Sequence, residues 1–276
     1  MYTGYKELML SDEQMANFYT SPERLTQDLI ENEYLLIEDL NGMPVDKYCY
    51  QNGELRKVNF PTVSNKYSKM IKPRNDQQVF ALDMLQDRTS KVKLLRGQYG
   101  AGKDFLALNQ ALKYVEDGFF QKIVYLRPNV TIANVPEIGY LKGSAEEKLE
   151  WTLAPFYDKV GGKDGVEYLI DDGQLEMVPL LFIRGRSFEN CLVYVCEAQN
   201  ITSEIAKLII SRIGEGSELW LTSDTHQTDA RIYDKDNGIT KMIDRLSGNK
   251  LFSYVYLPRT ERGEVANLAS LLDDEN

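Results

Sequence analysis

A glycine-rich segment in the middle of the chain constrains the fold more than any other feature. It runs from Gly97 to Asp104 and follows the apolar run Val92–Leu95, and apolar residues then recur at helical spacing until Asp117. Such a turn between a strand and a helix presents backbone N–H groups and the positive end of the helix to phosphate oxygens. The sequence therefore predicts a phosphate-binding loop, made of Gly97, Gln98, Tyr99, Gly100, Ala101, Gly102, Lys103 and Asp104.

The residue after the loop lysine departs from the usual pattern. Lys103 is expected to reach the β and γ phosphates of a nucleoside triphosphate, and the next position normally carries a Ser or Thr that ligates magnesium. Here that position is Asp104. A carboxylate also ligates magnesium, but it adds negative charge beside the triphosphate.

A second departure lies at the end of the apolar strand Leu192–Val195. Nucleoside triphosphatases commonly end this strand in Asp-Glu, where Asp holds the magnesium shell and Glu orients or deprotonates the attacking water. Here Cys196 replaces the Asp, and Glu197 remains. One hypothesis is a swap, in which Asp104 takes over part of the magnesium-holding task and serves with Glu197 as a metal ligand. The other is decay, in which the chain binds nucleotide but hydrolyses it poorly.

Polar residues also follow the third strand, Leu219–Leu221. Asp224 and Gln227 are candidate sensors of the γ phosphate or of the attacking water, because ligands of α/β sheets gather at the carboxyl ends of strands. His226, the single histidine, is expected to be solvated or structural. After the last strand, Arg259 and Arg262 are the best candidates for an arginine that stabilises a transferred phosphoryl group.

The region from residue 71 to 276 is predicted to be one α/β domain. Apolar strands at Ile123–Leu126, Leu192–Val195, Leu219–Leu221 and Phe252–Leu257 alternate with helical stretches near 145–160 and 203–213. This alternation indicates a mainly parallel sheet that is covered by helices on both faces.

Residues 1–70 are predicted to be a small α+β domain with a docking or lid role. Ser11 with Gln14 and Ser21 with Pro22 indicate short helices near 12–19 and 22–31. Apolar runs at 34–37, 45–50 and 55–60, separated by two Asn-Gly pairs, predict a three-stranded meander.

Composition restricts the location and the partners of the chain. The three cysteines lack metal-type spacing, which favours reduced thiols and a cytoplasmic location. The sequence contains no run of about 18 apolar residues, so we expect no transmembrane helix. A formal net charge of −10 argues against broad nonspecific binding to nucleic acid. Binding by a local basic face or an assembled pore stays open, and the residues Lys66, Lys69, Lys72 and Arg74 form either such a face or a solvated basic linker.

Taken in order along the chain, these motifs resemble those of the PhoH-like family, P-loop ATPases whose RecA-like core is related to superfamily 1 helicases. The resemblance covers residues 70 to 272 and includes the following positions: Gln77 or Gln78, Gly97 to Asp104, Arg127-Pro128, Gly139-Tyr140-Leu141 with Gly143, Ile183-Arg184-Gly185-Arg186, Glu197-Ala198-Gln199-Asn200, and Asp224 with Gln227 and Asp229. The chain departs from the family at Asp104, Cys196 and Ser223. The preceding region resembles the small domain that follows a PIN nuclease domain in some members. No PIN domain fits in this N-terminus, so the resemblance does not imply nuclease activity.

The resemblance implies a role for several residues. It assigns Lys103 to phosphate binding, Glu197 to water activation, Asp224 and Gln227 to sensing, Arg262 to a finger-like role, and Gln77 or Gln78 to reading adenine. It implies ATP and Mg²⁺ as ligands and a homo-oligomer, in particular a hexameric ring. The leading hypothesis is an ATPase that moves on or remodels single-stranded RNA or DNA. The alternatives are a nucleotide-binding regulatory or scaffold protein with little or no hydrolysis, and a small-molecule kinase.

Overall fold

The apolar runs of the sequence lie side by side in one six-stranded parallel sheet. The computed structural model describes residues 2–24, 26–59, 62–128, 153–224 and 236–261. The strand order is β12-β7-β11-β10-β8-β9, and every neighbouring pair is parallel. The strands are β7 (Val92–Gly97), β8 (Ile123–Leu126), β9 (Leu175–Met177), β10 (Leu192–Val195), β11 (Glu218–Asp224) and β12 (Phe252–Leu257).

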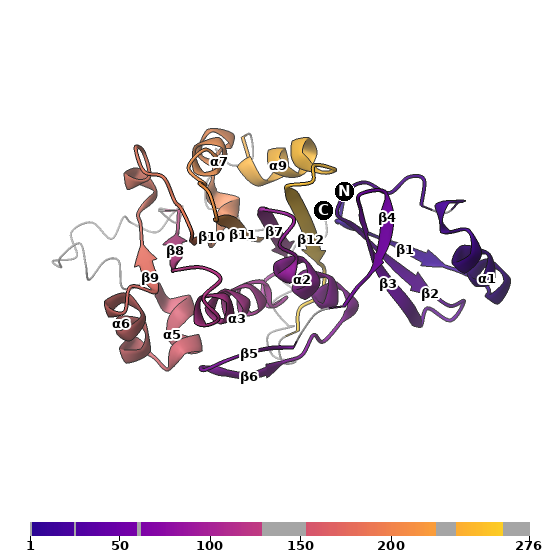
Figure 1. Ribbon diagram of the computed structural model, residues 1–276, viewed down its shortest axis with the longest axis horizontal. Coiled ribbons are helices and arrows are strands. Elements are labelled where there is room, and N and C mark those ends of the chain that lie inside the picture. Colours follow the sequence, from indigo (N-terminus) through magenta and orange to yellow (C-terminus); the bar gives the residue numbers. More distant parts are fainter. Residues whose placement is uncertain (1, 25, 60–61, 129–152, 225–235, 262–276) are drawn as a thin grey trace, which may run out of the picture.

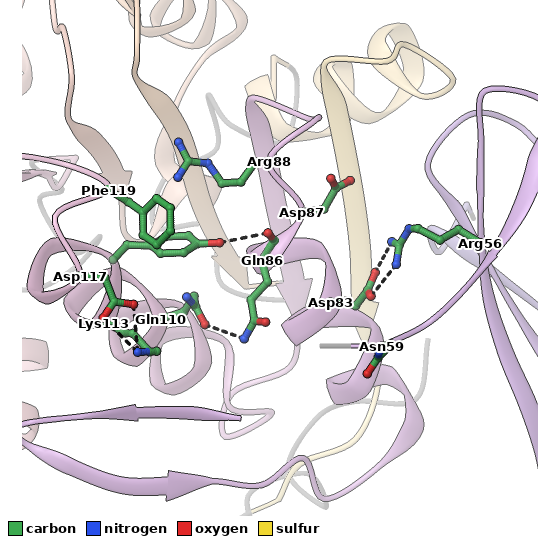
Figure 2. A pocket seen from close by; sticks show the side chains of 11 residues that line it. Arg56, Asn59, Asp83, Gln86, Asp87, Arg88, Gln110, Lys113, Asp117 and Phe119 are labelled. Atoms are coloured by element: carbon green, nitrogen blue, oxygen red, sulfur yellow. Dashed lines mark hydrogen bonds and ion pairs between the residues drawn. The ribbon is translucent and has the colours of Figure 1, made fainter. Parts of the chain in front are cut away.

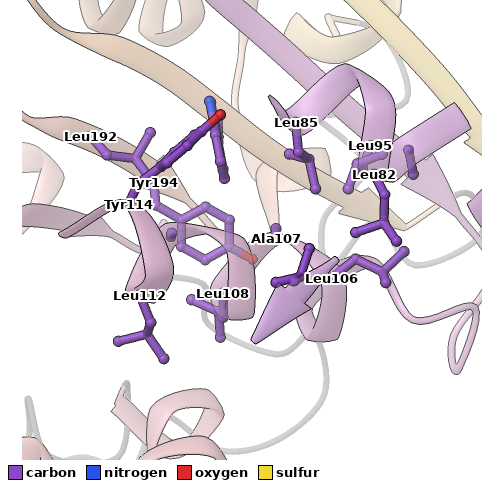
Figure 3. Packing of buried hydrophobic residues seen from close by; sticks show 14 of the residues in the cluster. Leu82, Leu85, Leu95, Leu106, Ala107, Leu108, Leu112, Tyr114, Leu192 and Tyr194 are labelled. Carbon is purple, nitrogen blue, oxygen red and sulfur yellow. The ribbon is translucent and has the colours of Figure 1, made fainter. Parts of the chain in front are cut away.

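Helices cover both faces of this sheet, with α2 and α3 on one side and α7 and α9 on the other (Figure 1). The helices are α2 (Asp76–Gln86), α3 (Lys103–Glu116), α5 (Ala154–Val160), α6 (Lys163–Asp171), α7 (Ser203–Ile210) and α9 (Gly238–Leu246), with 3₁₀ turns η3 (Leu180–Phe182) and η4 (Ala198–Asn200). Because successive strand residues point to opposite faces, Leu95 packs in the cluster with α2 and α3, whereas Leu94 packs in the cluster with α7 and α9. Figure 3 shows part of the first cluster.

The position of the loop strand defines the fold class. Strand β7 leads into the glycine-rich loop, and β11 separates it from β10, the strand that ends before Glu197. This order is that of the RecA-like P-loop fold. The prediction of an α/β fold with a mainly parallel sheet is therefore confirmed, and the described strands of this sheet are all parallel.

A smaller sheet precedes this core. Its strands β1 (Tyr5–Met9), β2 (Glu33–Glu38), β3 (Pro44–Gln51) and β4 (Glu54–Lys57) follow one another in that order, and α1 (Asp12–Thr20) begins at the predicted capping box of Ser11 and Gln14. The predicted three-stranded meander corresponds to the antiparallel strands β2–β4, and β1, which was not predicted, pairs in parallel with β2 as a fourth strand. Strand β1 has no fully buried residue and therefore no apolar signal in the sequence.

The prediction of a second N-terminal helix near 22–31 was wrong. Among the described residues of that segment, only the 3₁₀ turn η1 (Pro22–Arg24) forms. A further turn, closed by the Leu29 N–H donating to the Thr26 carbonyl, brings Leu29 into the cluster that includes Phe18 and Leu35. Burial of Leu29 beside α1 therefore replaces continuation of a helix.

The two sheets share a hydrophobic core and a polar contact. Tyr34 of β2 stacks on Phe80 of α2, with ring centroids 4.8 Å apart, and its hydroxyl donates to Asp83 at 2.8 Å. Arg56 of β4 donates to both oxygens of the same carboxylate, at 2.9 and 2.6 Å. The small sheet is thus fixed to α2. A domain boundary at residue 70 stays a prediction.

A two-stranded hairpin connects the sheets along the chain. Strands β5 (Val63–Asn65) and β6 (Ser68–Ile71) are antiparallel and lie beside α3 (Figure 1). The Asn65 side-chain amide donates to the Asn109 carbonyl of that helix at 3.0 Å. The hairpin was not predicted, because its strands are short and mostly polar.

Candidate nucleotide-binding site

The glycine-rich loop lies between β7 and α3, at the carboxyl edge of the parallel sheet. Gly102 precedes α3 and has a φ of +89°, a conformation that residues with a side chain rarely adopt. Gly97 is required for a different reason, because a Cβ there would lie 2.4 Å from the Leu257 carbonyl oxygen of β12. Gly102 therefore owes its glycine to the shape of the loop, as does Gly100 with a φ of +73°, whereas Gly97 permits close packing of neighbouring strands.

Lys103 is buried and closes over its own loop. Its Nζ donates to the carbonyl oxygens of Gly97 and Gln98, at 2.7 Å each, and lies 3.2 Å from Asp224 Oδ2 at the end of β11. The sequence predicted that both charged residues belong to the site, and the fold brings them into contact. The ammonium group is thus located between the loop backbone and the sensor strand.

Two cavities meet at this lysine. One, of about 400 Å³, is lined by Gly100, Gly102, Lys103, Asp104 and residues of the neighbouring elements, namely Lys72, Arg74, Gln78, Phe105, Pro155, Asp158, Lys159 and Glu261. The other, of about 230 Å³, is lined by Tyr99, Gly100, Lys103, Asp104, Glu197, Gln199, Thr222, Ser223 and Asp224. Because they share Gly100, Lys103 and Asp104, an elongated ligand that contacts the loop can extend into both.

The two candidate adenine-reading glutamines have different positions. Gln77 donates to the Glu7 carboxylate of the small sheet at 3.1 Å. Gln78 lines the larger cavity, donates to the Ala101 carbonyl at 3.0 Å and accepts from the Arg74 backbone N–H at 2.9 Å. Of the two, Gln78 is the one in contact with the loop.

Glu197 lines the smaller cavity together with Asp224, and a glutamine connects them. The Gln199 amide donates to Glu197 Oε2 at 2.6 Å, and its oxygen accepts from the Asp224 backbone N–H at 2.9 Å. Glu197 has a φ of +56°, a left-handed conformation that costs a non-glycine residue on the order of 1 kcal/mol. Sequence reasoning included Gln199 in a motif without a role, and only the pairing of β10 with β11 reveals one.

The two departures from the usual pattern are in contact. The Cys196 thiol lies 3.5 Å from Asp104 Oδ1. The same oxygen accepts hydrogen bonds from the Tyr194 hydroxyl at 2.5 Å and the Thr222 hydroxyl at 2.7 Å. Sequence reasoning missed Tyr194 and Thr222, since each lies within an apolar strand.

Burial controls the protonation of the groups around Asp104. Burial, with the nearby Asp104 and Glu197 carboxylates, raises the pKa of the Cys196 thiol well above its usual value. Burial and Asp104 likewise raise the pKa of the Tyr194 hydroxyl. Both groups therefore stay protonated at neutral pH. A neutral thiol is a poor ligand for magnesium, which prefers oxygen.

Several predicted residues lie outside the described residues: Gln227, His226, Asp229, Arg262 and the Gly139–Gly143 segment. Arg259 follows β12. Burial raises the pKa values of Glu38 and Tyr5 of the small sheet, and the positive charge of Arg259 opposes this rise. Arg186 pairs with Glu176 at 2.7 Å. The predicted basic cluster is divided, because Lys72 and Arg74 line the larger cavity whereas the Lys66 ammonium lies over the Tyr67 and Tyr168 rings.

Another cavity, of about 500 Å³, lies where the small sheet meets α2 and α3 (Figure 2). Its charged groups already have partners within the protein. Arg56 pairs with Asp83, Lys113 pairs with Asp117, and Arg88 pairs with Glu218. None of the residues that line this cavity belongs to the glycine-rich loop, so we place the nucleotide site at the loop.

The fold and the loop together define a P-loop nucleotide-binding protein of the RecA-like class. Within the described residues, no three or more His, Cys, Asp or Glu side chains form a metal-binding group. A magnesium ion that binds together with a triphosphate needs only one or two carboxylates, so Asp104 and Glu197 are compatible with it.

None of the described helices has the length and apolarity to cross a bilayer.

Residues 70–267 match the model of a protein family described as PhoH-like protein. The chain belongs to this family, which confirms the resemblance. It is 31% identical to protein PhoH2 of Bacillus subtilis (strain 168), over 98% of this chain and 64% of that protein. It is 34% identical to protein PhoH2 of Mycolicibacterium smegmatis, over 74% of this chain and 48% of that protein. The chain thus spans less than two thirds of the length of these relatives. The Bacillus alignment includes the small sheet, which precedes the family match.

Among solved structures, the chain is similar to a Sulfolobus solfataricus SWI2/SNF2 ATPase core in complex with dsDNA. The TM-score is 0.38 at 12% sequence identity, and the match covers 76% of this chain and 48% of that one.

Proposed function

We propose that this protein is an ATPase that acts as an oligomeric ring and couples ATP hydrolysis to movement on, or remodelling of, single-stranded RNA or DNA. One observation carries the ATPase part of the proposal. Lys103, Glu197 and Asp224 come from three different elements and line one cavity beside the phosphate loop. A lysine for phosphate, a carboxylate for water and a polar sensor at the carboxyl edge of the sheet are the groups that phosphoryl transfer to water requires.

Each residue then has a defined task. The loop N–H groups and Lys103 hold the phosphates, and Gln78 contacts the loop on the side of the larger cavity. Glu197 orients the attacking water and accepts its proton, while Asp224 responds to the γ phosphate. Gln227 is a further sensor, and Arg262 supplies positive charge to a neighbouring site in the ring. These roles for Gln227 and Arg262 rest on the family resemblance.

Asp104 and Glu197 would hold magnesium, which when bound neutralises charge on the β and γ phosphates. The oxygen donors of both side chains suit this ion. Asp104 lines both cavities, and its Oδ2 has no hydrogen bond to the described residues. Cys196, at the position where the family has a carboxylate, remains a neutral thiol.

Coupling to a polymer requires more than one chain. The described core has one parallel sheet of this size and supplies one wall of a motor cleft, and in this proposal the second wall comes from another subunit. The net charge of −10 disfavours nucleic-acid contact over the whole surface and favours contact in a channel of the ring. A cytoplasmic location is part of this proposal.

The test is ATP hydrolysis with and without single-stranded RNA or DNA, together with the native mass of the assembly. The proposal predicts turnover that the polymer increases, and a mass of several subunits. Lys103→Ala is the control that abolishes phosphate binding. Tight binding without turnover, also in the oligomer, would instead support a regulatory or scaffold protein, and phosphate transfer to an added metabolite would support a kinase.

A further inference from the structure

The side chain of Asp104 is fixed by two hydroxyl groups from neighbouring strands. Tyr194 lies on β10 and Thr222 on β11, which pair in parallel, and both side chains are buried. Both hydroxyls donate to the same oxygen, Oδ1 of Asp104, at 2.5 and 2.7 Å. The carboxylate thus reaches from the first turn of α3 to the two central strands that end at the site.

The protons of this cluster can be counted. The Tyr194 and Thr222 oxygens lie 3.0 Å apart, and each hydroxyl has a single proton. A hydroxyl that donates its proton to Asp104 Oδ1 cannot also donate it to the neighbouring hydroxyl. Two donors that converge on one oxygen suit an ionised carboxylate, which accepts several hydrogen bonds and forms the stronger, charge-assisted kind.

The cluster suits an aspartate at this position and not the usual Ser or Thr. The carboxylate of Asp is one bond further from the backbone than the hydroxyl of Thr, so a Thr at position 104 would not reach both hydroxyls. It would also remove the acceptor that the two buried hydroxyls share.

Cys196 completes the arrangement. Its thiol lies 3.5 Å from Asp104 Oδ1, so a carboxylate at position 196 would face Asp104 at close range. Like charges at that distance repel each other strongly in a partly buried site. Without a cation between them, a carboxylate at only one of the two positions avoids this repulsion, and in this chain it is at position 104.

We propose that Tyr194 and Thr222 are positioning residues that fix Asp104 as the metal-side carboxylate of the site, so that helix α3 supplies the group that strand β10 usually provides. The two hydroxyls occupy Oδ1, and Oδ2 is the oxygen left for magnesium. The inference rests on the proposed function, because it assumes that magnesium enters this site with ATP.

The test is the affinity for a fluorescent ATP analogue, measured with magnesium and with EDTA. Tyr194→Phe and Thr222→Val each remove one hydroxyl with little change in shape. Since partners of metal ligands contribute about 10–100-fold to metal affinity, each variant should need about tenfold more magnesium for half-maximal enhancement of binding. Binding in EDTA should change far less than binding in magnesium. Thr222→Ser keeps a hydroxyl and should restore most of the magnesium response.

Tyr19→Phe is a matched control, because Tyr19 donates to Asp46 at 2.6 Å in the small sheet, far from the loop. It should leave the magnesium response unchanged. If Tyr194→Phe and Thr222→Val respond to magnesium as the wild type does, or if their binding falls equally in EDTA, the inference is overturned while the proposed function stands. If the wild type does not bind the analogue at all, both are overturned. Thermal unfolding of each variant identifies any loss of fold, and Thr222→Ser then provides the decisive comparison.

Discussion

Lys103 and Asp224 form a buried ion pair inside the proposed phosphate site, with Nζ 3.2 Å from Oδ2. The pair holds the lysine toward the end of β11. A bound triphosphate competes with the Asp224 carboxylate for this ammonium, so nucleotide binding must weaken the pair. We propose that Asp224 detects the phosphate in this way, through its ion pair with the lysine that binds it.

The variant Asp224→Asn tests this competition between the triphosphate and the Asp224 carboxylate for Lys103. The change removes an anion from the phosphate site, so we expect ATP to bind several-fold more tightly. Turnover should fall at least tenfold, because the sensor carboxylate is lost. Calorimetric titration and a phosphate-release assay measure the two effects. Weaker ATP binding in the variant would show that the carboxylate does not oppose the nucleotide.

The swap between positions 104 and 196 predicts non-additive variants. Asp104→Thr leaves the site without its metal-side carboxylate, and Cys196→Asp places a second carboxylate against the first. Each single variant should lose most of its magnesium-dependent ATP binding and turnover, whereas the double variant restores the usual pattern and should recover part of both. Additive losses in the double variant would contradict the swap and favour decay of the site.

The contact between the two sheets predicts a loss of stability in Arg56→Ala. Arg56 and Tyr34 are the hydrogen-bond partners of the buried Asp83 carboxylate, and removing one partner of such a group destabilises the fold. We expect a decrease of about 2 kcal/mol in the free energy of unfolding, measured with urea. Lys57→Ala is the control on the same strand as Arg56. It removes only the ion pair between the exposed Lys57 side chain and Asp46 of β3 and should have little effect.

The cysteines predict a specific pH dependence. Burial raises the pKa of the Cys49 thiol to about 12 and raises the pKa values of Cys191 and Cys196 as well. The folded protein therefore holds these protons more tightly than the unfolded chain does. Protonation of the thiols therefore contributes to the free energy of unfolding. This contribution is fully present below the thiol pKa of the unfolded chain, about 8.5, and is lost as pH rises toward the thiol pKa values of the folded protein.

Urea unfolding at several pH values measures this effect, and we expect the free energy of unfolding to fall above about pH 8.5. Cys49→Ala should lessen that fall. In the native protein at pH 8, the three thiols should react with a disulfide reagent far more slowly than in urea. A native reaction as fast as that of the unfolded chain would contradict the burial of these groups.

The sequence predicted those parts of the fold that a local pattern determines. Four consecutive apolar residues mark β10, and five of the six residues of β12 are apolar, so their ranges were correct. Helix α2 was not predicted as an element, because it lies between the two sheets and is buried on most sides, which removes the helical alternation of polar and apolar residues. Strand β1 was missed because it is an edge strand with no fully buried residue.

The candidate site shows the same division. The loop, Lys103 and Glu197 follow from one short motif each, and so does the pair of departures at Asp104 and Cys196. The roles of Gln199, Tyr194 and Thr222 depend on which strands are neighbours and in what register. Nothing in the local sequence determines that β11 lies between β7 and β10. These contacts therefore became visible only in three dimensions.

The central claim is that Lys103 and the surrounding loop bind a nucleoside triphosphate. Calorimetric titration of wild type and Lys103→Ala with ATP and magnesium tests it most directly. We predict saturable binding of about one ATP per chain in the wild type and none in the variant, with both proteins equally folded by circular dichroism. Equal binding by the two proteins, or no binding by the wild type, would contradict the claim.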